Sequence, residues 1–159
     1  YGYDDDKLET VLCQSLERAN LKLSVLEAGT DMALARLLNK TNAHVIAKAD
    51  SVAHPSELKA IYDPDNVLTL RDLAAKVATQ TRLDTDAAFG IVILVNPEVN
   101  EGGDANEATA VAVASEQNVR ARVYGFGGQA DFAPQWVSTW AMSQAWGMLR
   151  EMGHGTLDV

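Results

Sequence analysis

One turn, Glu27-Ala28-Gly29-Thr30, has the shape of a ligand site, although it carries no Lys, Ser or Cys that could do chemistry. An apolar run ends there at Leu26, and a helical pattern begins directly after Thr30. In α/β proteins the backbone N–H groups converge at such a strand-to-helix turn, so it commonly contacts a ligand. Nucleophilic catalysis would need a hydroxyl or thiol with a base in reach, and Thr30 is the only hydroxyl in the turn. Because Thr is also a preferred N-cap residue, we expect Thr30 to cap the helix that follows.

Other kinds of site have weaker signals. The three histidines, His44, His54 and His154, are far apart in the sequence and have no metal-ligand spacing, so we expect no metal site. The turn lacks the glycine pattern of a phosphate loop or a dinucleotide fingerprint, and we expect no cofactor. Gly127-Gly128 follows a predicted strand, where the two glycines either let a ligand approach the backbone or simply end the strand.

Alternating strands and helices must position these residues. The apolar spacing predicts helices over 4–20, from Thr30 through Leu38, from His54 through Ile61, over 69–81 and from Phe132 onward. It predicts strands over 21–26, 43–47 and 87–95, followed by a hairpin of 108–114 and 119–126. The segment 87–95 is almost continuously apolar, which is typical of a strand covered on both faces. We therefore predict an α/β protein, a three-layer α/β/α sandwich with a mixed sheet and a C-terminal hairpin plus helix.

Composition restricts the possible functions. The 159 residues suit one domain, and 13 Lys+Arg against 22 Asp+Glu give a net charge of −9. An acidic surface repels phosphate backbones and anionic lipid, so we expect neither nucleic-acid nor membrane binding. The single cysteine, Cys13, lies within a helical pattern as a small buried apolar residue, and no internal disulfide is possible, which favours a cytoplasmic location.

In their order along the chain, these segments resemble the C-terminal domain of the CinA family, the competence/damage-inducible proteins. That family has a strand followed by Ala-Glu-Ser-Cys-Thr-Gly-Gly, and the matching segment here is Leu26–Met32. Glu27 and Thr30 agree with the family pattern, whereas Ala28 stands where the family has its nucleophilic serine. The family's Ser-Ser-Ala-Tyr-Phe resembles 41–45, which places His44 at the position of a functional tyrosine.

Three further segments match only in part. The family's Asn-Glu-Ala-Lys is similar in place to His54–Glu57, where its lysine is not found. Pro97 is what the chain keeps of a Thr-Gly-Ile-Ala-Gly-Pro loop, and 106–111 weakly matches a Lys-Pro-Val-Gly-Thr-Val segment. Phe126-Gly127-Gly128 agrees with a glycine-containing segment before the last helix, although an arginine expected shortly after it is missing.

The resemblance implies a domain over 8–152, with a linker remnant at 1–7 and a frayed tail at 153–159. Stand-alone family members are nicotinamide mononucleotide amidohydrolases, but with alanine at the serine position we predict a degenerate domain without catalytic residues. The predicted pocket comprises Glu27, Ala28, Gly29, Thr30, His44, Pro97, Gly127 and Gly128. The domain would be a structural, oligomerising or nucleotide-binding module. One alternative is an active deamidase using Glu27, Thr30 and His44, and another is an unrelated α/β binding protein.

Two expectations concern partners. The resemblance and the tryptophans of the last helix, Trp136, Trp140 and Trp146, lead us to expect a homodimer, because exposed aromatic surface tends to mark an interface. In longer family members an N-terminal molybdopterin-binding-like domain precedes the linker, so we expect the chain to be attached to such a domain.

Overall fold

The computed structural model describes residues 8–30, 32–96, 108–124 and 133–152. Eleven elements follow one another along these residues. They are α1 (Leu8–Ala19), β1 (Leu23–Ala28), α2 (Ala33–Asn42), the 3-10 turn η1 (Ala43–Val45), β2 (Ile46–Val52), α3 (Ser56–Tyr62), α4 (Leu70–Thr85), β3 (Phe89–Val95), β4 (Thr109–Ala114), β5 (Val119–Tyr124) and α5 (Ala133–Glu151). The predicted linker remnant and tail lie outside the described residues.

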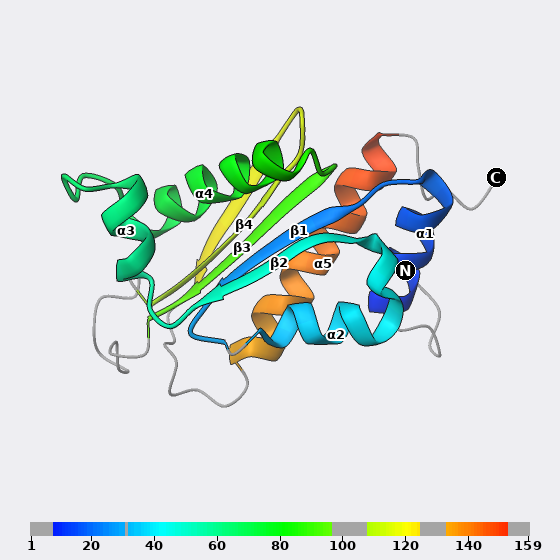
Figure 1. The fold of residues 1–159 in the computed structure, drawn as a ribbon, viewed down its shortest axis with the longest axis horizontal. Helices are drawn as coiled ribbons and strands as arrows, with labels where there is room; N and C mark the ends of the chain where they lie inside the picture. Colours follow the sequence, from blue (N-terminus) through cyan, green and yellow to red (C-terminus); the bar gives the residue numbers. More distant parts are fainter. Residues whose placement is uncertain (1–7, 31, 97–107, 125–132, 153–159) are drawn as a thin grey trace.

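The five strands form one mixed sheet in the order β2-β1-β3-β4-β5. β1 pairs in parallel with both β2 and β3, whereas β3, β4 and β5 pair in antiparallel fashion. Helices α1, α2 and α5 cover one face of the sheet, and α3 and α4 cover the other (Figure 1). The structure thus confirms the predicted three-layer sandwich, its mixed sheet and the hairpin followed by a closing helix.

β3 lies in the middle of the sheet with every residue buried, as its unbroken apolar sequence predicts. Ile91 and Ile93 contribute to the core beneath α1, α2 and α5, whereas Val92 and Leu94 face α4. A strand that is covered on both faces is typically apolar along its whole length.

The second strand differs from the prediction. Residues 43–45 form the turn η1, and β2 begins at Ile46 and extends to Val52. β2 is an edge strand, and it carries exposed Lys48 and Asp50, which form an ion pair at 3.3 Å. Charged side chains are common on edge strands because they oppose pairing with another chain. The apolar pattern therefore ends before most of the strand begins.

Two smaller expectations can be compared with the described residues. Cys13 is buried as predicted, and burial, with a smaller contribution from Glu9 and Glu17, raises the pKa of its thiol to about 11. None of the helices in the described part of the chain combines the length and apolar content that crossing a bilayer requires.

Candidate functional site

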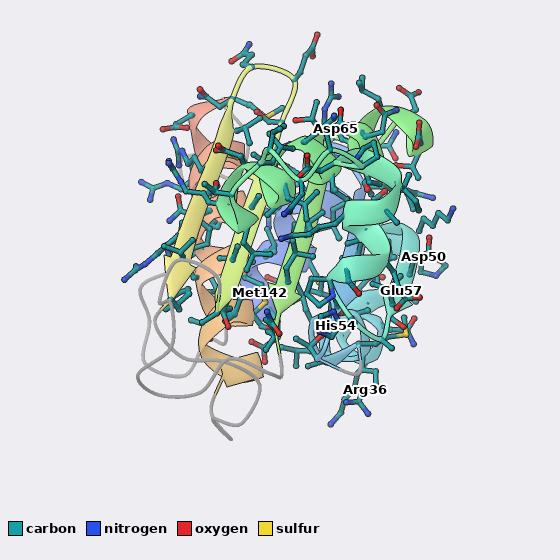
Figure 2. The ribbon with its side chains drawn as sticks, turned by 90° about the vertical axis from the view of Figure 1, so that its left-hand side faces the viewer. Arg36, Asp50, His54, Glu57, Asp65 and Met142 are labelled. Atoms are coloured by element: carbon teal, nitrogen blue, oxygen red, sulfur yellow. The ribbon has the colours of Figure 1, made fainter. Side chains whose placement is uncertain are left out.

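The turn after β1 lies where open α/β sheets bind ligands. The chain leaves β1 toward β2 on one side, and it leaves β3 toward β4 on the other. The carboxyl ends of β1 and β3 therefore form a topological switch point, the usual ligand position in such sheets. Figure 2 views the molecule from this side.

Gly29 lies directly against β3 at this switch point. Its φ of +79° is in the left-handed region that glycine adopts without strain. A Cβ atom at this position would be 2.4 Å from the carbonyl oxygen of Val95. The N–H of Gly29 also donates to the carbonyl oxygen of Val52 at 3.4 Å. Gly29 thus brings the turn into contact with the ends of both neighbouring strands.

Glu27 is fully buried and binds the start of α2. Its Oε1 accepts from the Thr30 hydroxyl at 2.7 Å and from the N–H of Leu34 at 3.0 Å. Its Oε2 accepts from the N–H of Ala35 at 3.0 Å. A carboxylate is well placed there, because the N-terminus of a helix carries partial positive charge and N–H groups that lack intrahelical partners.

The prediction that Thr30 caps α2 is wrong. The N-cap residue is Met32, with φ 60°, and its side chain accepts no hydrogen bond from a helix N–H. The N–H of Ala33 donates to the Thr30 carbonyl and that of Arg36 to the Met32 carbonyl. Together with the two bonds to Glu27, all of the first four N–H groups of α2 have acceptors within the protein. The Thr30 hydroxyl instead donates to Glu27, so it orients the carboxylate that replaces a cap.

We expect Thr30→Ala to lower the free energy of unfolding by about 1.5–3 kcal/mol, the range for a hydrogen bond to a charged group. Thr30→Ser keeps the hydroxyl and should lose much less. Urea denaturation followed by circular dichroism measures both variants. Equal stability of Thr30→Ala and the unmodified protein would show that the bond to Glu27 contributes nothing.

Ala28 points to the opposite face of the sheet from Glu27. Its methyl group is 0% exposed and belongs to the apolar cluster beneath α3 and α4, which includes Leu58 and Leu73. In the sheet it stands beside Val52 of β2 and Leu94 of β3. Ala28 is therefore an ordinary core residue.

The structure does not bring His44 to the turn. His44 lies in η1, just before β2 begins, whereas the turn follows the end of β1. Because β1 and β2 are parallel, His44 lies at the amino ends of these strands and the turn at their carboxyl ends. His44 is exposed and lines a separate hollow of about 360 Å³ together with Glu17 and Lys22.

A histidine that the sequence assigns only to the opening of a short helix lies at the carboxyl ends of the parallel strands, on the same side of the sheet as the turn. His54 follows β2, and its Nδ1 accepts from the N–H of Ser56 at 3.0 Å. Oε2 of Glu57 accepts from the N–H groups of Ala53 and His54 at 2.9 and 3.1 Å. Figure 2 shows His54 and Glu57 close together, whereas Arg36 points away from the molecule. The signal was the position of His54 after a parallel strand, since the ends of parallel strands share an edge.

Pro97, Gly127 and Gly128 of the predicted pocket lie outside the described residues. Of that pocket, the structure brings together Glu27, Ala28, Gly29 and Thr30. Among the residues that it describes, no group of three or more His, Cys, Asp or Glu side chains is arranged to hold a metal ion.

Solved structures with the same fold exist in several bacteria. A CinA superfamily protein from Klebsiella pneumoniae matches with a TM-score of 0.74 and 17% identity, covering 91% of this chain and 96% of that one. One from Escherichia coli matches with a TM-score of 0.69 and 18% identity over 91% of each chain. The competence/damage inducible protein CihA from Agrobacterium tumefaciens matches with a TM-score of 0.68 and 12% identity, over 96% of this chain and 99% of its own.

The sequence comparisons give no match. No protein-family model matches the chain, and no curated protein matches it either. The likeness is thus one of three-dimensional structure, and it covers nearly all of this chain and of its neighbours. The chain has the fold of the CinA superfamily.

Proposed function

We propose that this chain is a CinA-type module that does not hydrolyse nicotinamide mononucleotide and acts instead as a structural, oligomerising or nucleotide-binding domain. The observation that carries the proposal is the buried methyl group of Ala28, at the position where the resemblance places a serine nucleophile. Acyl transfer or hydrolysis by that route needs an attacking oxygen, and alanine supplies none.

The hydrogen bonds of the turn support the same proposal. Developing negative charge in a transition state is stabilised by N–H donors that are pre-positioned toward it. At the start of α2, the N–H groups of Leu34 and Ala35 are already bound to Glu27. The Thr30 hydroxyl donates to the same carboxylate. These donors are used to hold the fold together.

A base for a serine at position 28 is also hard to supply. His54 is the imidazole that the described residues bring to this edge, and its Nδ1 is occupied by the N–H of Ser56. In the neutral ring the proton then sits on Nε2, so neither nitrogen has a lone pair available to remove a proton.

The alternative of a deamidase with relocated residues requires Glu27, Thr30 and His44 to act together. Glu27 and Thr30 are bonded to each other, and His44 lies at the opposite edge of the sheet. No observation favours this alternative. The CinA-type fold argues against the second alternative, that the chain is an unrelated α/β binding protein.

We expect neither the unmodified protein nor Ala28→Ser to release ammonia or nicotinic acid mononucleotide from nicotinamide mononucleotide. Catalytic groups that act as a unit are strongly non-additive, so one restored hydroxyl cannot replace the rest. The assay needs an active family member as its positive control, and equilibrium dialysis with the same nucleotide reports binding without turnover. Turnover by the unmodified protein would refute the proposal, whereas turnover by Ala28→Ser alone would show that the other catalytic groups are present.

We further propose that the module is a homodimer that uses α5. Trp140 on this helix is only partly buried against the core. Light scattering should give twice the monomer mass. A monomer at high protein concentration would contradict this prediction without affecting the one on turnover.

A further inference from the structure

A second hollow lies at the amino ends of β1 and β3, opposite the end of the sheet that carries the turn. Its volume is about 460 Å³, within the usual range for a small-molecule site. Lys22 precedes β1, Ala88 precedes β3, and Arg82 and Asp86 come from the end of α4. Glu116 reaches it from the β4–β5 hairpin. With Ala47 and Met152, five segments that are distant in sequence contribute to its walls, and none of them belongs to the turn at Gly29.

The backbone at Arg82 is held rigidly against β3. A Cβ on Gly90 would be 2.2 Å from the carbonyl oxygen of Ala78 and 3.1 Å from the Cβ of Arg82. Such close contact between helix and strand is possible only because position 90 is glycine. The N–H of Ala87 also donates to the Arg82 carbonyl at 3.1 Å. The start of the Arg82 side chain is therefore fixed at the wall of the hollow.

The guanidinium of Arg82 has unused hydrogen-bonding capacity. Nη1 makes one long bond to the Ala87 carbonyl, at 3.4 Å, and Nε is buried without an acceptor. A buried N–H without an acceptor is costly, and a guanidinium is planar and suited to two parallel bonds to a carboxylate or phosphate. The guanidinium therefore has donors left for one anionic group at the wall of the hollow.

Lys22 supplies a second positive charge on the same hollow. Its carbonyl accepts from the N–H of Ala88 at 2.8 Å, which ties the start of β1 to the start of β3. Within the described part of the chain its ammonium forms no ion pair, nor does either cation pair with Asp86 or Glu116 in the lining. Two cations without an ion pair thus line one hollow.

We propose that this hollow binds a small organic molecule through one carboxylate or phosphate group held between Arg82 and Lys22. The lining also contains two carboxylates, Asp86 and Glu116, so the remainder of the ligand is polar or cationic rather than a second anion. The site is independent of the turn at Gly29, and it stands or falls separately from the absence of nucleotide hydrolysis.

The test is a titration of the ¹⁵N-labelled full chain, followed by two-dimensional NMR of the Arg82 Nε–H and the backbone amides. Inorganic phosphate and sodium acetate are added in separate arms, and sodium chloride at matched ionic strength is the control. We expect saturable shifts at Arg82 Nε–H and at the amides of 85–88 in at least one arm, with no such shifts in chloride. The two arms distinguish a phosphate ligand from a carboxylate ligand.

Three variants make the result decisive. Arg82→Gln should weaken the response about tenfold, because a charge-assisted bidentate contact is lost. Arg71→Gln removes an arginine from the same helix, outside the hollow, and should leave the response unchanged. Lys22→Gln, at an exposed position, gives an independent variant if Arg82→Gln does not fold. No saturable shift in either arm, or equal weakening by Arg71→Gln, would overturn the proposal.

Discussion

Gly29→Ala should destabilise the protein by roughly 2–5 kcal/mol, the sum of about 1–2 kcal/mol for a left-handed backbone with a Cβ and about 1–3 kcal/mol for overpacking. The new Cβ would lie 2.4 Å from the carbonyl oxygen of Val95, a backbone atom at the end of a fully buried strand. Neither partner can move without shifting β1 or β3. Urea denaturation followed by circular dichroism measures the loss.

Gly147→Ala is a control of the opposite sign. Gly147 lies within α5, and a Cβ there would meet Nη1 of Arg120 at 3.5 Å, an ordinary contact. Replacing a glycine inside a helix by alanine stabilises by up to about 1 kcal/mol. If the free energy of unfolding of Gly29→Ala lies within about 0.5 kcal/mol of that of the unmodified protein, the close approach to Val95 is contradicted, because ordinary surface substitutions have effects of that size.

The parts of the fold that the sequence predicts well are those in which local pattern and burial coincide. Phe89–Val95 reads as a buried strand because every position is apolar, and the structure covers both of its faces. The hairpin is predicted equally well, since two alternating runs flank a short polar turn. The sequence places the second strand too early, because β2 is an edge strand with Lys48 and Asp50 and lacks an apolar pattern that would reveal it.

The arrangement of the turn depended on contacts that spacing cannot reveal. Thr30 has the right residue type for a cap, but the carboxylate of Glu27 reaches the same N–H groups from the end of β1. Whether a strand residue or a turn residue caps a helix depends on the direction in which the chain enters it. The positions of His44 and His54 could not be predicted without the strand pairing. Only the parallel pairing of β1 and β2 shows that His44 lies at the amino ends of the strands and His54 at their carboxyl ends.

Glu27→Ala should cost roughly 2–6 kcal/mol, since each of two buried N–H groups left without an acceptor costs about 1–3 kcal/mol. The N–H groups of Leu34 and Ala35 would lose their acceptor in a place that is closed to water. Glu27→Gln keeps one acceptor oxygen and should recover part of the loss. Urea denaturation of both variants gives the free energies of unfolding.

Glu57→Ala is the matched control for the burial of Glu27. Oε2 of Glu57 also accepts from two backbone N–H groups near the start of a helix, those of Ala53 and His54, but its side chain is exposed. Water can replace that carboxylate, so we expect a loss of about 1 kcal/mol or less, as for an ordinary cap. If Glu27→Ala costs no more than Glu57→Ala, then the N-terminus of α2 is accessible to solvent. Its N–H donors would in that case be available to a ligand, and the argument that the turn uses them only to hold the fold together would fail.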